Sequence, residues 1–165
     1  MKDHPKVKIN LTTTDKIIEI ISWMVIIGIW VLTLMNYEKL PEQIPIHYNG
    51  TGEVDGFGDK SHILILPIVA TLLFTGLTVL NKYPRVFNYF VPITQENVFW
   101  QYSNATRLIR SVKLLFVVVF GLIVFMTIQI AKGTADGLGV WFLPLTIGLF
   151  FILIMYYYLK SVRRH

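Results

Sequence analysis

The chain contains no cysteine among its 165 residues. Disulfide bonds, zinc–thiolate centres and cysteine nucleophiles are therefore excluded. Charged residues are also scarce, at 15% of the chain, whereas they make up about a quarter of an average soluble domain. Hydrophobic residues account for 54%, and the mean hydropathy is +0.57. This balance indicates an integral membrane protein.

The hydrophobic residues gather in four long runs. Each run is long enough to cross the hydrocarbon core as a helix, because about 20 residues at a rise of about 1.5 Å span it. Little chain remains for a separate soluble domain, so residues 1–165 are predicted to form one integral membrane domain. The predicted fold class is all-α, a bundle of four transmembrane helices at about residues 17–36, 63–80, 114–131 and 138–159.

The first hydrophobic run follows a basic start and therefore resembles a signal peptide. However, it is longer than the usual hydrophobic region of such a peptide. Tyr37, Glu38 and Lys39 follow it in place of a small-residue cleavage site. We therefore expect an uncleaved transmembrane helix, with Glu19 at the membrane interface near its N-terminus.

The distribution of lysine and arginine predicts the orientation. Twelve of these fifteen residues lie in the N-terminal segment, the loop 81–113 and the C-terminal end, which share one side of a four-span protein. The positive-inside rule places both termini in the cytoplasm and the loop 37–62 outside a cytoplasmic membrane. These basic residues on the cytoplasmic segments explain the net charge of +5. The lipid bilayer is therefore the predicted partner, and no nucleic-acid partner is predicted.

The inner loop, residues 81–113, ends in an amphipathic pattern. Thr94 is predicted to cap a helix that has Glu96 in its first turn. One face of this helix is apolar at helical spacing and carries Val98, Tyr102, Ala105, Ile109 and Val112. Arg107, Arg110 and Lys113 lie off that face. The pattern predicts a helix along the cytoplasmic membrane surface that leads into the third span, with its basic residues at the lipid headgroups.

The outer loop contains the densest turn chemistry of the chain, the stretch LPEQIPIHYNGTGEVDGFGDK at residues 40–60. Pro41 and Pro45 restrict the residues before them to extended geometry. Apolar residues alternate from Ile44 to Tyr48, which favours a short strand. Asn49-Gly50 and Asp55-Gly56 are turn dipeptides, and we expect Asp55-Gly56 to turn a second short strand back. A compact β-like cap is predicted, with Tyr48 and Phe57 touching the membrane.

Four interpretations of this outer loop remain open. It closes the first two helices structurally, or it recognises an external peptide or protein. It binds a metal through His47, Glu53, Asp55, Asp59 and His62, although their spacing matches no metal-binding signature. It performs acid/base catalysis through His47 and Asp55, although no serine or cysteine nucleophile motif accompanies them. The leading prediction is recognition without metal or cofactor. The residues assigned to it are Pro41, Pro45, His47, Asn49, Gly52, Asp55, Gly56 and Lys60.

Two segments of the chain resemble a known family. The spaced pattern Leu40-Pro41-x-x-Ile44-Pro45-x-His47-x-Asn49-x-x-Gly52-x-x-Asp55-Gly56-x-Gly58-x-Lys60 is similar to the signature of a bacterial membrane domain of unknown function, which also forms the N-terminal part of SdpI-type immunity proteins. The cytoplasmic stretch of such proteins resembles Phe87-Asn88-Tyr89, Ile93-Thr94-x-Glu96-Asn97 and Gln101-Tyr102. The resemblance implies a multi-span protein of the bacterial cytoplasmic membrane. SdpI-type members protect against a secreted toxin and act as a membrane receptor for a transcriptional repressor.

The functional expectation is a non-enzymatic membrane protein of the SdpI-related type. Its outer loop senses a ligand, and its cytoplasmic segment couples to a protein partner. The residues assigned to coupling are Asn88, Tyr89, Thr94, Glu96, Asn97, Arg107 and Arg110. Three alternatives stay open: a transporter or channel component that uses Gln129 and the threonines of the second span, a structural membrane subunit, and an enzyme acting on lipid or cell-wall precursor. The chain is also compatible with a homo-oligomer.

Overall fold

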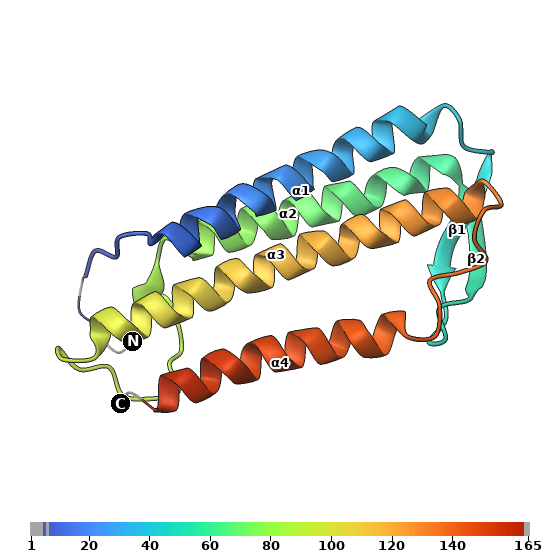
Figure 1. Ribbon diagram of the computed structural model, residues 1–165. Coiled ribbons are helices and arrows are strands. Elements are labelled where there is room, and N and C mark those ends of the chain that lie inside the picture. The colour runs from blue at the N-terminus through green and yellow to red at the C-terminus, as the bar shows by residue number, and fades with distance from the viewer. Residues whose placement is uncertain (1–4, 6, 164–165) are drawn as a thin grey trace.

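The computed structural model describes residue 5 and residues 7–163. Four long helices run side by side, with a small antiparallel hairpin across one end (Figure 1). The helices are α1 (Thr13–Tyr37), α2 (Ile65–Leu80), α3 (Val98–Ala131) and α4 (Phe142–Val162), and the strands are β1 (Gln43–Tyr48) and β2 (Val54–Asp59). Two 3-10 helices, η1 (Lys60–Leu64) and η2 (Pro84–Val86), flank α2. We call the end that carries β1 and β2 the hairpin end and the opposite end the terminal end.

The four predicted long apolar helices are confirmed. Each is long and apolar enough to cross a membrane, when η1 and α2 are taken together as one helical segment. Both chain ends approach the terminal end of the bundle (Figure 1). Lys2, Lys6 and Arg164, which contribute to the predicted orientation, lie outside the described residues.

The structure corrects the prediction for residues 98–113. They are helical and lead into the third span, as predicted, but they form one continuous helix with that span rather than a separate helix on the membrane surface. At about 1.5 Å per residue, α3 is about 51 Å long and exceeds a hydrocarbon core of about 30 Å. The chain from Val98 to Lys113 contains no proline or glycine that would break the helix. Its polar side chains have partners on α1, α2 and α4, so bundle contacts favour the straight helix.

α3 is the central helix, because it packs against each of the other three long helices. The core between α1, α2 and α3 is formed by aliphatic and aromatic side chains such as Ile29, Phe74 and Val124. A Cβ added at Gly121 would lie 3.3 Å from Ile29 Cγ1, so a glycine allows α1 and α3 to approach closely. α1 and α2 are also joined by a hydrogen bond, because Thr71 Oγ1 of α2 accepts from Trp30 Nε1 of α1 at 2.9 Å.

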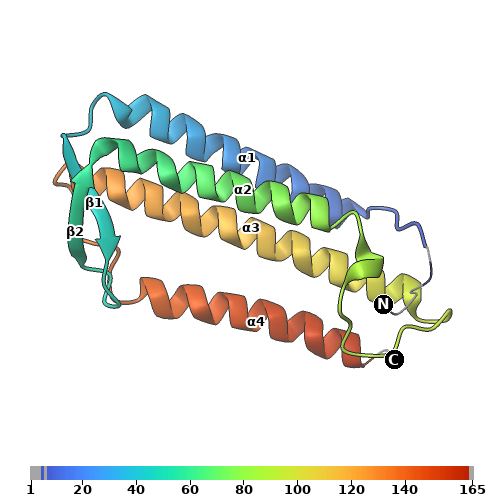
Figure 2. The same ribbon diagram turned by 180° about the vertical axis from the view of Figure 1, so that it is seen from behind.

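α4 is attached mainly at the terminal end of the bundle. Its buried residues are Tyr157 and Ser161, both in its last two turns. Asn104 Nδ2 donates to the Tyr157 carbonyl, and Gln101 Nε2 donates to the Ser161 carbonyl. Figure 2 shows α4 beside α3, on the side away from α1. Toward the hairpin end, Phe142 and Leu143 of α4 line a cavity.

The predicted β-like cap is confirmed as the β1–β2 hairpin, but its turn lies elsewhere than expected. The turn is formed around Asn49–Gly52, whereas Asp55 and Gly56 lie inside β2. Register shifts on either side of His47 mark an irregular pairing. Gly56 leaves room for the opposite strand, because a Cβ there would lie 3.1 Å from His47 Cβ. The glycine therefore serves strand pairing rather than chain reversal.

Candidate ligand-binding site beneath the hairpin

The turn of the hairpin is organised by Asn49. Its Oδ1 accepts hydrogen bonds from the backbone N–H and the hydroxyl of Thr51 and from the backbone N–H of Glu53. Its Nδ2 donates to Glu53 Oε2 at 3.0 Å, and its carbonyl accepts from the N–H of Gly52. An asparagine side chain that mimics a backbone turn in this way fixes the chain reversal locally.

A backbone clasp joins this turn to the α3–α4 loop. The N–H of Leu138 donates to the Gly52 carbonyl at 2.7 Å, and Glu53 forms an isolated antiparallel bridge with Gly137. Gly52 has φ +78°, and a Cβ there would lie 2.6 Å from Gly139 O. A Cβ at Gly137 would lie 2.5 Å from Gly52 O. The backbones meet too closely for any side chain, which explains glycine at these positions.

The other end of the hairpin is fixed to the start of η1. Lys60 Nζ donates to Glu42 Oε1 at 2.8 Å, and the Lys60 N–H donates to the Glu42 carbonyl. Ile44 and Ile63, each 1% exposed, belong to the hydrophobic core beneath. Pro45 is buried in the same region, whereas Pro41 is exposed. Lys60 and Pro45 thus hold the hairpin in place.

The structure brings His47 and Asp55 together across the two strands. The Nδ1 of His47 lies 2.5 Å from Asp55 Oδ1. His62, by contrast, directs Nδ1 at the Asp59 carbonyl, at 2.8 Å. Within residue 5 and residues 7–163, no group of three or more His, Cys, Asp or Glu side chains is arranged to hold a metal ion. Of the weak metal candidates, only His47 and Asp55 therefore meet.

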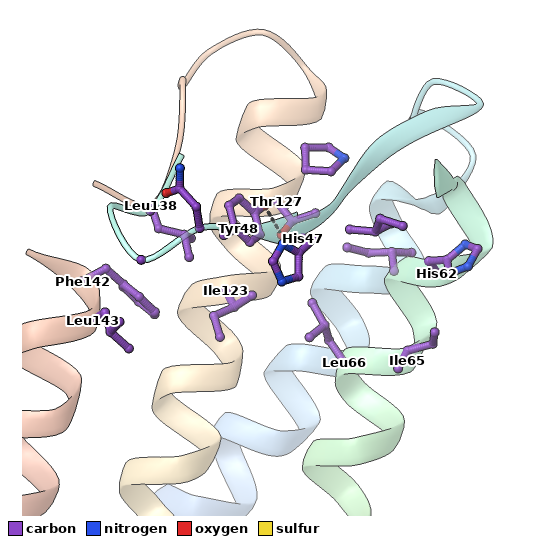
Figure 3. A pocket seen from close by; sticks show the side chains of 16 residues that line it. His47, Tyr48, His62, Ile65, Leu66, Ile123, Thr127, Leu138, Phe142 and Leu143 are labelled. Carbon is purple, nitrogen blue, oxygen red and sulfur yellow. Dashed lines mark hydrogen bonds between the residues drawn. The ribbon is translucent and has the colours of Figure 1, made fainter. Parts of the chain in front are cut away.

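A cavity of about 520 Å³ lies beneath the hairpin. β1 and the turn form its roof, and the first turns of α2, the last turns of α3 and the start of α4 form its walls (Figure 3). The walls are mostly apolar, and Figure 3 shows the ring of His47 directed from β1 toward Ile123 and Leu66. The volume lies within the range of about 300–1,000 Å³ typical of small-ligand pockets. Of the predicted recognition residues, Pro45, His47, Asn49 and Gly52 line it.

Sequence reasoning missed the walls that the helices contribute. Tyr48 Oη and Thr127 Oγ1 lie 2.7 Å apart and join β1 to α3 across 79 positions of sequence. Burial raises the pKa of Tyr48, so its hydroxyl keeps its proton at neutral pH. Tyr48 was expected to touch the membrane, but its hydroxyl instead bonds inside the bundle.

We expect Tyr48→Phe and Thr127→Val each to lower the free energy of unfolding by about 1 kcal/mol, because each removes one partly buried hydrogen bond. The double variant should cost about as much as either single variant, since both remove the same contact. Denaturant titration in detergent micelles measures this double-mutant cycle. Fully additive costs would show that the two hydroxyls do not interact.

The carboxylate of Glu53 is stabilised by the turn. The side chains of Asn49 and Thr51 donate to it and hold the pKa of Glu53 below its ordinary 4.5. Because the folded pKa is below the unfolded one, this contribution to stability is complete above about pH 4.5 and is lost as the pH falls through the lowered value.

We therefore expect the Thr51 amide resonance to titrate with a midpoint below 4.5 in an NMR pH series. Asn49→Ala should move that midpoint upward, because it removes the strongest donor to Glu53. Asn88→Ala, a change in the exposed inner loop, should leave it unchanged. A midpoint insensitive to Asn49→Ala would contradict the assignment.

The predicted coupling residues lie at the terminal end. Asn88, Thr94 and Glu96 are exposed. Thr94 and Asn97 form two reciprocal hydrogen bonds just before α3. Asn97 Oδ1 accepts from the Thr94 N–H, and Thr94 Oγ1 accepts from the Asn97 N–H. The Tyr89 hydroxyl donates to the Pro84 carbonyl at 2.7 Å, and burial raises the pKa of this tyrosine. These contacts order the inner loop.

The basic residues of α3 do not face lipid headgroups, which corrects the prediction for Arg110 and Lys113. Arg107 donates to both carboxylate oxygens of Asp15, at 2.8 and 3.1 Å. Arg110 Nε lies 3.3 Å from Glu19 Oε1, and Lys113 Nζ lies 2.6 Å from Glu19 Oε2. We call these five residues the ionic cluster. The sequence contained one signal for this cluster: Asp15 and Glu19 stand at i and i+4 and therefore share one face of α1.

Comparison with known proteins gives two matches. Residues 24–71 match the family described as "Domain of unknown function (DUF1648)". An uncharacterised protein of Archaeoglobus fulgidus is 36% identical over 86 residues, which cover 47% of this chain and 47% of that protein. The chain thus spans about half the length of this relative. No solved structure matches.

The DUF1648 match covers most of α1, both strands and the first turns of α2. The roof of the cavity and its α2 wall therefore lie in the matched segment. Together with the four apolar helices, the match indicates a membrane protein.

Proposed function

We propose that this protein is a non-enzymatic membrane receptor of the SdpI-related type, which binds an external ligand in the cavity beneath the hairpin. The observation that carries the proposal is that cavity, roofed by an ordered hairpin and walled by three helices. The excess of lysine and arginine in the segments at the terminal end supports an orientation with that end in the cytoplasm and the hairpin outside. The ligand then reaches the cavity from the external side.

The hairpin is built as a rigid roof rather than as a simple connection. Three separate ties hold it: Lys60 to Glu42, Gly52 to Leu138 and Tyr48 to Thr127. A loop that only joined α1 to α2 would need no contact with α3 or with the α3–α4 loop. Rigid loops on a helical scaffold frequently carry binding function.

α3 supplies a physical connection between the cavity and the cytoplasmic side. Ile123 and Thr127 line the cavity, and the same continuous helix carries Arg107, Arg110 and Lys113 of the ionic cluster. A ligand that separates α4 from α3 would act on the Gln101 and Asn104 contacts at the terminal end. The inner loop, with exposed Asn88 and Glu96, is the surface we assign to a protein partner.

Transport and catalysis receive less support from the site. Between Lys113 and its end at Ala131, α3 carries Thr127 and Gln129 as its only polar side chains. Thr127 is already bonded to Tyr48. His47 and Asp55 form a pair, and the hydroxyls of Tyr48 and Thr127 bond each other. A nucleophile activated by His47 would instead share a hydrogen bond with it.

The test is photo-crosslinking in native membranes with a benzophenone amino acid at Leu143, which lines the cavity. The matched control is Ile152 on the same helix, 66% exposed and outside the cavity. We expect a discrete adduct at position 143 that position 152 does not give. Identical adducts at both positions would show that the cavity holds only bulk lipid and would remove the basis of the proposal.

A further inference from the structure

The cavity beneath the hairpin is open between α2 and α4. Among the described residues, α4 packs against α3 but makes no comparable contact with α2. Ile65 of α2 and Leu143 of α4 line the cavity from opposite walls (Figure 3) and remain 51% and 46% exposed. Both belong to helical segments that are long and apolar enough to cross a membrane, so this open side faces the hydrocarbon of the bilayer.

The dimensions of the cavity fit one alkyl chain. A methylene group takes up about as much space as a water molecule, about 30 Å³, so a cavity of about 520 Å³ holds roughly seventeen methylene groups. Ile123, the lining residue of α3 farthest from the hairpin, lies about 12 Å below the end of that helix at about 1.5 Å per residue. This depth lies within one leaflet, which is half of a hydrocarbon core of about 30 Å. The two chains of a phospholipid would need about twice the volume.

The lining of the cavity offers no charged partner to an ionic ligand. None of the described residues that line it is Lys, Arg, Asp or Glu. A phosphate, carboxylate or ammonium group placed inside would lose its hydration without gaining an opposite charge. The lining therefore disfavours the head groups of phospholipids, fatty acids and long-chain amines, and it favours an uncharged head group.

His47 offers a hydrogen bond to such a head group. Its side chain lines the cavity, and Figure 3 shows its ring directed toward Ile123 and Leu66. Nδ1 is engaged by Asp55 Oδ1, so Nε2 is the ring nitrogen left for a ligand among the described contacts. A hydroxyl group both donates and accepts, so it can bond this nitrogen whether or not the nitrogen carries a proton.

We infer that the ligand is an uncharged amphiphile with a single alkyl chain and a hydroxyl-bearing head group, such as a monoacylglycerol. Its chain lies along Leu66, Ile123 and Leu143, and its head group lies under the roof, where a hydroxyl bonds His47 Nε2. This inference rests on the proposed function and names the class of ligand. It accounts together for a side open to the bilayer, a volume of one chain and a lining without charge.

The experiment uses the full chain in phosphatidylcholine nanodiscs and a monoacylglycerol that carries a photoreactive diazirine in its chain. After illumination, peptide mass spectrometry locates the adducts. We expect adducts on the cavity-lining residues of α2, α3 and α4. Leu143→Trp, which places a larger side chain in the cavity, should abolish them. Leu145→Trp, outside the cavity on the same helix, should preserve them.

Unlabelled competitors test the charge of the head group and the number of chains. Monooleoylglycerol should suppress the adducts. Oleate and oleylamine should require roughly tenfold higher concentrations, because each would bring an unpaired charge into the cavity. Dioleoylglycerol, which is uncharged but has two chains, should also compete poorly because the cavity holds one chain.

A variant of His47 tests the head-group contact separately. His47→Leu removes the ring that bonds the hydroxyl and keeps an apolar side chain in its place. It should weaken competition by monooleoylglycerol roughly three- to tenfold, the effect of one hydrogen bond. Competition by a plain alkane of the same chain length should not change. Equal losses for both competitors would overturn the assigned contact with His47.

The outcomes separate the two proposals. Oleate, oleylamine or dioleoylglycerol competing as well as monooleoylglycerol would overturn the uncharged single-chain class and leave the receptor function standing. Absence of cavity adducts, together with a discrete adduct of a water-soluble ligand at position 143 in native membranes, would have the same consequence. Adducts indifferent to Leu143→Trp, or absent together with identical benzophenone adducts at positions 143 and 152, would overturn both proposals.

Discussion

Replacing Lys113 with alanine is expected to lower the free energy of unfolding by about 3–5 kcal/mol, because it removes one partner of a buried ion pair. Lys113 is 1% exposed. Its Nζ lies 2.6 Å from Glu19 Oε2 and 3.0 Å from Thr78 Oγ1, and 4.6 Å from the centre of the Phe74 ring. The methyl group of alanine cannot form any of these contacts. Denaturant titration in detergent micelles, followed by circular dichroism, measures the loss.

The size of the loss depends on the charge left behind. Glu19 keeps Arg110 Nε at 3.3 Å, so its carboxylate is not fully uncompensated and the lower part of the range is expected. Lys113→Met, which conserves most of the volume, separates the charge from the cavity that alanine would create. If the electrostatic account is correct, Lys113→Met/Glu19→Gln should recover much of the stability that Lys113→Met loses.

Lys132→Ala provides the matched control at the other end of α3. Lys132 Nζ lies 2.5 Å from Asn36 Oδ1 in an exposed contact, so its removal should change stability by less than about 0.5 kcal/mol. Equal costs for Lys113→Ala and Lys132→Ala would contradict the idea that the ionic cluster is a buried, stabilising network.

The partners of the basic residues in the ionic cluster could not be predicted from the sequence. Arg107, Arg110 and Lys113 lie off the apolar face of their helix, and spacing along one helix does not reveal a partner on another. In the pairs described above, Asp15 and Glu19 lie 91 to 94 positions earlier in the chain. The local pattern therefore favoured lipid headgroups as the partners of these basic side chains. In the folded protein, α1 packs against α3 and brings the carboxylates of Asp15 and Glu19 within bonding distance.

The long helices and the hairpin were predictable because their signals are local. Runs of apolar residues set α1, α2 and α4 to within a few residues, and Pro45, Asn49 and the glycines indicated a compact turn-rich cap. The cavity was not predictable, because its walls come from α2, α3 and α4 as well as from the hairpin. Which of two turn dipeptides reverses the chain was also decided beyond local sequence, since Gly56 is needed opposite His47.

Gly52→Ala is expected to release the clasp between the hairpin turn and the α3–α4 loop, at a cost of about 2–4 kcal/mol. Two effects act together. Gly52 has φ +78°, which is unfavourable for alanine, and the added Cβ would lie 2.6 Å from Gly139 O. The turn must move, and the Leu138 N–H then loses its 2.7 Å bond to the Gly52 carbonyl. Faster hydrogen exchange at the Leu138 amide measures this release.

Gly50→Ala is a control two residues away in the same turn. Gly50 has no positive φ, and a Cβ there would have nothing within 4 Å. The change should alter stability by less than about 0.5 kcal/mol and leave the exchange of Leu138 unchanged. Similar behaviour of Gly50→Ala and Gly52→Ala would show that the turn tolerates side chains generally and that the clasp is not a close backbone contact.

Gly137→Ala approaches the same contact from the opposite side and makes the argument independent of φ at Gly52. A Cβ at Gly137 would lie 2.5 Å from Gly52 O, and Gly137 has no positive φ, so its cost comes from the clash alone. Because both variants break one clasp, Gly52→Ala/Gly137→Ala should cost little more than Gly52→Ala. Costs that add in full would mean that each glycine serves a different contact. If the clasp holds the roof of the cavity, both single variants should also weaken the adduct at position 143.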